Sequence, residues 1–233
     1  MRYRPLYRFP AISAAIGFLD ALPINKRSSL RNIIVHEDRI SAGYPDGHAI
    51  GLIPFYQENG RLRIRHKFSM VRNLFERAYF SRYPVFDEIQ DQKDEATAEV
   101  MFRIAAVDLH PVVANCLAEA MYLPDAGMPD GSYTLLLDGE DAEDLCSAIF
   151  RQDVLGREAM RLVLNRALKA DPNSDWANEY SYEIRLYLTA HAGALKHLVN
   201  KTSLFESNFY PGHLAKRRRI DGALRESWDA GMC

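Results

Sequence analysis

The sequence has few cysteines and no long apolar run. Its 233 residues include three cysteines, Cys116, Cys146 and Cys233, which are too few and too far apart for a disulfide framework or a paired metal-ligand motif. We therefore expect three free thiols in a reducing compartment. No stretch reaches the ~20 apolar residues of a membrane-spanning helix. The sequence predicts a cytoplasmic or nuclear protein without a membrane segment.

Familiar motifs of catalysis and cofactor binding are also missing. The chain contains no Gly-x-x-x-x-Gly-Lys loop, no Gly-x-Gly-x-x-Gly turn and no Gly-x-Ser-x-Gly elbow. The acidic run 138–144 is better explained by the start of a helix, because acids are stabilised near the positive end of the helix dipole, than by a cation site. The sequence thus predicts no cofactor, no metal site and no catalytic residue of a known kind.

Charge is balanced in total but uneven along the chain. Residues 1–80 carry 13 Lys and Arg against 6 Asp and Glu, residues 81–180 carry 8 against 20, and residues 181–233 carry 8 against 5. A basic first third beside an acidic middle is typical of segments that neutralise each other inside one fold, although it could also steer a charged partner.

Hydrophobic periodicity predicts an α+β fold, mostly helical, with a few short strands and a single composite core. The chain is either one unit over 1–233 or two lobes, a basic mixed α/β lobe at 1–90 and a mostly helical lobe at 91–233. Strands are expected at 33–35, 61–68 and 133–137. Helices are expected at 11–22, around 28–30, 48–57, 71–79, from 92 onward, 111–123, 140–150, 157–170, 176–199 with Gly193 as a candidate break, and 213–230. The helix 157–170 is apolar nearly all round, so we expect it to be buried.

The predicted strand at 61–68 alternates strictly between apolar and basic residues. One face carries Leu62, Ile64, His66 and Phe68, and the other carries a ladder of four cations: Arg61, Arg63, Arg65 and Lys67. Such a ladder could follow phosphates, but it lacks aromatic residues for base stacking, so nucleic acid is disfavoured. We expect the ladder to lie close to the acidic middle segment.

Several blocks resemble a family. These are Phe-Leu-Asp-Ala-Leu-Pro at 18–23, Leu-Arg-Asn-Ile-Ile-Val-His-Glu-Asp at 30–38, and the block at 48–59 followed by Leu-Arg-Ile at 62–64, together with 133–139 and 145–150. The chain resembles a large group of uncharacterised proteins from filamentous ascomycete fungi, which implies a folded fungal domain and no particular activity. Leu22-Pro23 followed by Leu30 and Ile33 is similar to the opening of an F-box.

Three functions are compatible with these features. The first is a non-catalytic intracellular protein-interaction domain that binds an unidentified protein through Leu22, Pro23, Leu30, Ile33 and the ladder Arg61, Arg63, Arg65 and Lys67. The second is an F-box-like substrate adaptor, whose residues 18–40 would bind a Skp1-type partner. The third is an enzyme of unfamiliar type with a pocket lined by His36, Glu37 and His48.

The two termini each allow two interpretations. Arg2, Arg4 and Arg8 precede the apolar segment 11–19, which fits an ordinary first helix better than a targeting signal. Near the other end, a basic tail precedes an apolar stripe that includes Trp228. The tail helix either docks on the body or stays free as a nuclear-import signal or a grip for an acidic partner. The basic tail consists of Lys216, Arg217, Arg218 and Arg219.

Overall fold

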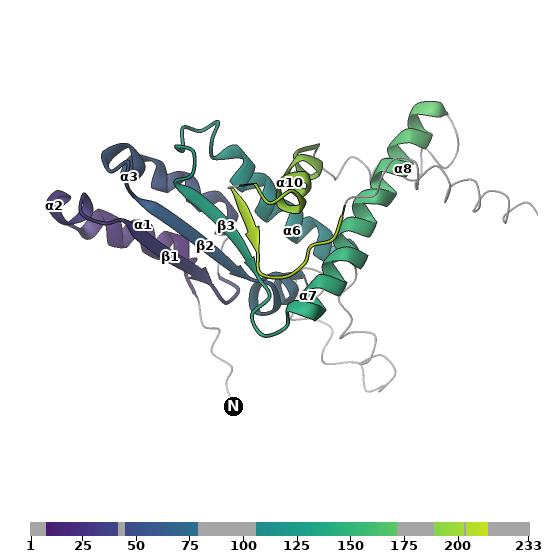
Figure 1. The fold of residues 1–233 in the computed structure, drawn as a ribbon, viewed down its shortest axis with the longest axis horizontal. Coiled ribbons are helices and arrows are strands. Elements are labelled where there is room, and N and C mark those ends of the chain that lie inside the picture. The colour runs from purple at the N-terminus through teal and green to yellow at the C-terminus, as the bar shows by residue number, and fades with distance from the viewer. Residues whose placement is uncertain (1–7, 42–44, 79–105, 172–188, 203, 214–233) are drawn as a thin grey trace, which may run out of the picture.

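A computed structural model describes residues 8–41, 45–78, 106–171, 189–202 and 204–213. It contains a four-stranded sheet whose strands all run parallel and lie side by side in chain order (Figure 1). The strands are β1 (Asn32–Glu37), β2 (Arg63–Ser69), β3 (Tyr133–Asp138) and β4 (Phe205–Ser207).

Helical segments precede β1 and fill each connection. The prediction of a mixed, mostly helical fold is confirmed by this architecture. The segments are α1 (Ala11–Ala21) and α2 (Ile24–Arg27) before β1; η1 (Pro45–Leu52) and α3 (Ile53–Glu58) between β1 and β2; η2 (Met70–Phe75) and α6 (Ala106–Tyr122) between β2 and β3; and α7 (Glu143–Ile149), η3 (Phe150–Leu155), α8 (Gly156–Ala170) and α10 (Thr189–Val199) between β3 and β4.

The two faces of the sheet differ in chemistry because side chains alternate along each strand. One face, called the covered face, packs on the helices through Ile33, Val35, Glu37, Ile64, His66, Phe68, Tyr133, Leu135, Leu137 and Phe205. The opposite face, called the open face, carries no helix among the described residues. It presents Asn32, Ile34, His36, Arg63, Arg65, Lys67, Thr134, Leu136, Asp138 and Glu206.

The core is one continuous cluster of buried side chains that runs from Ile12 in α1 to Phe209 after β4. The sheet takes two strands from the first 90 residues and two from the rest. In α6, the residues Leu109, Val113 and Leu117 are fully buried. Burial at this three-to-four-residue spacing is what holds the helix in place.

Three details differ from the sequence-based expectations. The expected helix start at Pro111 is wrong, because α6 runs through this residue from Ala106. Its packed apolar face outweighs the one hydrogen bond that proline cannot make. Strand β4 was not predicted. In addition, Gly193 does not break α10.

The expected burial of 157–170 is also wrong. Helix α8 extends away from the sheet (Figure 1), and its Met160 and Leu162 are exposed. Its buried residues among those described are a charged pair, in which Arg161 donates to both carboxylate oxygens of Glu158 at 2.7 and 2.6 Å. The helix fails to be enclosed because it lies at the end of the sheet, where it contacts chiefly η3 and α6.

Cys116 and Cys146 are buried and form no disulfide bond, as predicted, whereas Cys233 lies outside the described residues. Burial, with nearby carboxylates such as Asp138, raises the pKa of the Cys146 thiol to about 11. This thiol is therefore protonated and inert at neutral pH.

A substitution at Leu135 tests the assignment of the core, because this residue lies on β3 with strands on both sides and is almost wholly buried. We expect Leu135→Ala to lower the free energy of unfolding by about 2–5 kcal/mol, from lost burial and the cavity left behind. Urea unfolding followed by circular dichroism measures this. Leu145→Ala, at an exposed position on α7, is the control and should change stability by less than about 0.5 kcal/mol. Equal effects would contradict the assignment of the core.

Candidate functional site

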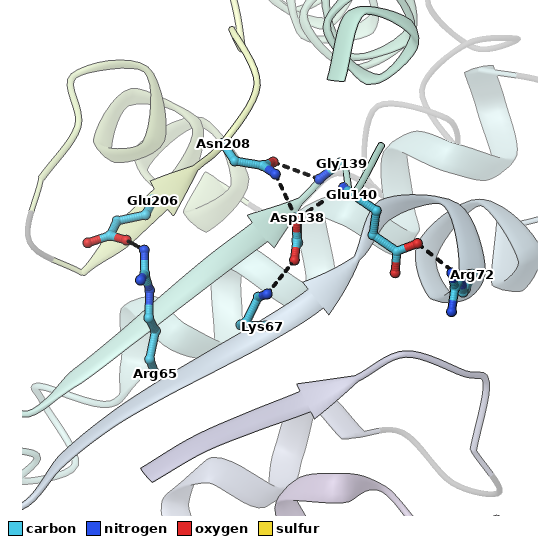
Figure 2. A network of polar contacts seen from close by, with 8 residues as sticks. All are labelled: Arg65, Lys67, Arg72, Asp138, Gly139, Glu140, Glu206 and Asn208. Atoms are coloured by element: carbon cyan, nitrogen blue, oxygen red, sulfur yellow. Dashed lines mark hydrogen bonds and ion pairs between the residues drawn. The ribbon is translucent and has the colours of Figure 1, made fainter. Parts of the chain in front are cut away.

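The carboxyl ends of parallel strands are where α/β proteins most often place functional groups. In this chain Asp138 ends β3 and is the centre of a polar network (Figure 2). Its Oδ2 lies 2.6 Å from Lys67 Nζ on β2. Its Oδ1 accepts hydrogen bonds from Asn208 Nδ2 at 2.7 Å and from the N–H of Glu140 at 3.0 Å. The carboxylate thus joins β2, β3 and the segment after β4.

The network also holds the turn that leads from β3 into α7. Asn208 Oδ1 accepts a hydrogen bond of 2.7 Å from the N–H of Gly139. Glu140 has a φ of 51°, a left-handed conformation that costs a non-glycine residue roughly 1–2 kcal/mol. Its carboxylate lies 3.0 Å from Arg72 Nε, and its N–H is bound by Asp138. These contacts hold Glu140 in its strained conformation.

The ionisation of Asp138 follows from this environment. Burial alone would raise the pKa of its carboxyl group, but the bond to Lys67 and the hydrogen bond from the Glu140 N–H outweigh it, so the pKa is lowered. Both carboxylate oxygens are occupied by protein groups. A carboxylate in this state is a poor proton acceptor, and its arrangement is suited to positioning the loop.

The cation ladder is neutralised in part, and by contacts that cross strands. Lys67 pairs with Asp138, which lies in the acidic middle segment, so the expected proximity of ladder and acidic segment is confirmed. Arg65 reaches across β3 to pair with Glu206 on β4 (Figure 2). Arg63 donates to the carbonyl oxygens of Gly60 and Leu62 and has no carboxylate partner within the described residues.

The β1 side of the open face is the part that remains exposed. Ile34 is 68% exposed, and in the strand register it lies beside Arg65. His36 and Arg63 are exposed as well. By contrast Leu136 on β3, which lies between Lys67 and Glu206 in the register, is buried. The open face therefore combines an exposed apolar side chain with unneutralised positive charge.

A second polar cluster lies on the covered face and is closed to solvent. His66 Nδ1 lies 2.8 Å from Tyr133 Oη, and His66 Nε2 lies 3.5 Å from Glu37 Oε1, which is long for a hydrogen bond and acts as an electrostatic contact. Glu37 also accepts a hydrogen bond of 2.9 Å from the N–H of Ile12. A cavity of about 10 Å³, lined in part by His66, Tyr133 and Glu119, adjoins the cluster. This volume admits roughly one water molecule.

The Glu37 carboxylate caps helix α1 from a different element. Burial would raise its pKa, but the contact with His66 and the N–H groups of Ala11 and Ile12 together lower it. The positive end of a helix dipole favours a negative charge at this position. Glu37 therefore ties the first helix to the first strand by electrostatics.

The structure does not bring together the residues that the sequence suggested as one site. Ile33 packs on the covered face, opposite the ladder. Leu22 and Pro23 lie between α1 and α2, and Leu30 precedes β1. The basic tail, Lys216 to Arg219, lies outside the described residues.

The pocket suggested for an enzyme is not formed either. His36 and Glu37 are neighbours on β1, so their side chains point to opposite faces of the sheet. His48 instead contacts Ser13, with Nδ1 3.1 Å from the hydroxyl oxygen. Within the described residues no group of three or more His, Cys, Asp or Glu could hold a metal ion.

Sequence reasoning missed Ile34, Glu206 and Asn208. Ile34 could have been found, because the alternation of β1 puts it on the face opposite Ile33 and Val35. Glu206 and Asn208 carry no local signal, since they act on residues that are 141 and 70 positions away.

No protein-family model, curated protein or solved structure matches this chain. None of the helices in the described part is long and apolar enough to cross a membrane.

Of the residues in this network, Asp138 should lower the free energy of unfolding most when it is replaced. We expect Asp138→Ala to lower the free energy of unfolding by about 1.5–3 kcal/mol, because Lys67, Asn208 and the Glu140 N–H lose a charged acceptor. Chemical denaturation measures the change. Asp141→Ala, which alters an exposed carboxylate of the same turn, is the control. The assignment fails if both variants are equally stable.

Glu37 should contribute a pH-dependent share of stability. Its pKa is lower in the folded than in the unfolded chain, so ionised Glu37 stabilises the fold above about pH 4.3. That contribution is lost as the pH falls through the lower, folded-state pKa. We therefore expect Glu37→Gln to be less stable than wild type at pH 7, and the difference to shrink towards pH 3. Urea unfolding across this range measures it, and a difference that is constant with pH would contradict the prediction.

Proposed function

We propose that this chain is a non-catalytic protein-interaction domain and that the open face of its sheet is the docking surface. The observation that carries the proposal is the one-sided sheet. Parallel sheets normally have both faces covered, because their crossover connections place helices on them. In the described part of this chain the helices pack on the covered face alone, and the other face exposes Ile34 among cations.

The topology favours surface binding over a cofactor crevice. In doubly wound α/β proteins the ligand crevice opens where the strand order reverses. The order here, β1-β2-β3-β4, has no reversal. Parallel sheets that progress in one direction with helices on one face also occur in leucine-rich-repeat solenoids, which bind partners through an extended concave surface. The polar groups at the carboxyl ends of the strands bind one another, which also supports a structural role for them.

The composition of the open face indicates the chemistry of the partner. Arg63 is exposed on the open face at the amino end of β2, close to the exposed Ile34, and the exposed Arg31 and Arg61 precede β1 and β2. A protein segment with an apolar side chain flanked by carboxylates would complement them. Nucleic acid is a weaker candidate, because Arg65 and Lys67 are already paired with acids and the open face has no phenylalanine, tyrosine or tryptophan among the described residues for base stacking.

The F-box-like alternative has less support. Residues 8–41 form α1, α2 and β1, so the segment that opens like an F-box continues into the sheet. An adaptor of that class would need a third helix in this position.

Charge reversal at Arg63 tests the proposal. We expect Arg63→Glu to lose proteins that wild type captures from cells of its source, while Lys169→Glu, an exposed charge reversal on α8 away from the sheet, keeps them. Quantitative mass spectrometry of affinity-purified, equally folded variants makes the comparison. If the same proteins are captured by all three chains, or if none is captured reproducibly, the open face is not the docking surface.

A further inference from the structure

The two edges of the sheet are unequal. At one edge β4 is three residues long, and short edge strands are one way in which proteins prevent unwanted pairing. At the other edge β1 is six residues long and contains neither lysine nor proline, the residues that commonly protect edges. Among the residues that the structure describes, β1 pairs with β2 alone, and no strand lies along its outer side.

The backbone of β1 presents a defined set of unused groups along this outer edge. The N–H of Arg63 donates to the carbonyl of Arg31 at 2.7 Å, so Arg31, and every second residue after it, faces β2. The N–H and C=O groups of Asn32, Ile34 and His36 therefore point outward. These are the groups that an added strand would bind.

The sequence of β1 is complementary to itself in one antiparallel register. With a two-fold axis at Ile34, this residue lies opposite its own copy, and Asn32 lies opposite His36 of the partner subunit. All the outward-facing backbone groups are then used, because each of these residue pairs can exchange two N–H···O=C bonds. On the covered face, Ile33 lies opposite Val35 of the partner subunit.

Side-chain exposure supports association at this end of the molecule. Ile34 is 68% exposed, and the neighbouring α1 exposes Phe18 at 53%. In the proposed register the two Ile34 side chains, both on the open face, cover each other. Asn32 and His36 of the partner subunit are both polar and can hydrogen-bond across the strands.

We propose that the chain forms a homodimer in which β1 pairs antiparallel with β1 of a second copy, centred on Ile34. The two sheets then form one continuous eight-stranded sheet with both open faces on the same side. The dimer shares the exposed Ile34 with the proposed function, but it rests separately on the outward N–H and C=O groups of β1.

Sedimentation equilibrium of the full chain is the first test, and we expect a monomer–dimer equilibrium. Ile34→Pro removes an outward N–H and leaves the β1–β2 bonds in place, as proline at an edge allows. We expect it to raise the dimer dissociation constant by about 100-fold or more, because an unpaired backbone group would be left in the interface. Ile34→Lys should act similarly, whereas Ile24→Lys, a matched change at an equally exposed isoleucine, should have little effect. Circular dichroism and urea midpoints confirm that each variant is folded.

A cysteine at the axis tests the register itself. In the proposed pairing the two Ile34 Cα atoms are about 5.5 Å apart, within the range of a disulfide. With Cys233 replaced by serine, Ile34→Cys should give a reducible dimer under mild oxidation, and Ile24→Cys should not. The proposal is overturned if wild type stays monomeric at every concentration reached. It is also overturned if Ile34→Pro leaves the dimer intact, or if Ile34→Cys forms no link. Arg63→Glu separates the two proposals. A variant that no longer captures partners but still forms the dimer affects the open face and leaves the pairing of β1 intact.

Discussion

The direction in which the sheet is wound is the constraint on which the rest of this structure depends. Four parallel strands follow one another in chain order, so each connection must cross the sheet, and crossovers of one hand all return over the same face. That geometry gathers the helices, and with them Phe68, Leu137 and the other core side chains, on the covered face. Within the described part of the chain it leaves the opposite face without a helix, and that face is mostly polar. The single core and the one-sided surface thus have the same cause.

Charge on the open face follows from this arrangement. Each of Arg65 and Lys67 finds a carboxylate on a later strand, at Glu206 and Asp138, so the ladder ties β2 to β3 and β4. The Arg65–Glu206 pair is half exposed, so it adds at most about 1 kcal/mol, while the shielded Asp138 network contributes more. Within the described residues, the open-face cation without a carboxylate partner is Arg63, beside β1, and this is where the proposed partner would find complementary charge.

Local patterns in the sequence predicted the strands well where alternation was strong. The alternation of Leu62 to Phe68 marked β2, and Ile33 to Val35 marked β1. Strand β4 could not be predicted in this way, because three residues are too few to show a period and its pairing with β3 joins residues far apart in the chain. The same limit applies to the Asp138 network, whose partner Asn208 has meaning only once β4 is placed. The suggestion of one pocket lined by His36 and Glu37 could have been rejected from the sequence, because the side chains of neighbouring residues on a strand point to opposite faces of the sheet.

The free edge and the open face have a combined consequence. A two-fold axis perpendicular to the sheet would place two copies of Ile34 at the centre of one surface, with Arg63 of each subunit on either side of it. A partner with two acidic and apolar segments could then engage both copies, and the second contact would form at the effective concentration set by the linker between the segments. Modest affinity at each open face would be enough for stable capture. In this arrangement the pairing of the β1 edges joins two binding surfaces, and each open face recognises the partner. Neither contact then has to bury a large area alone.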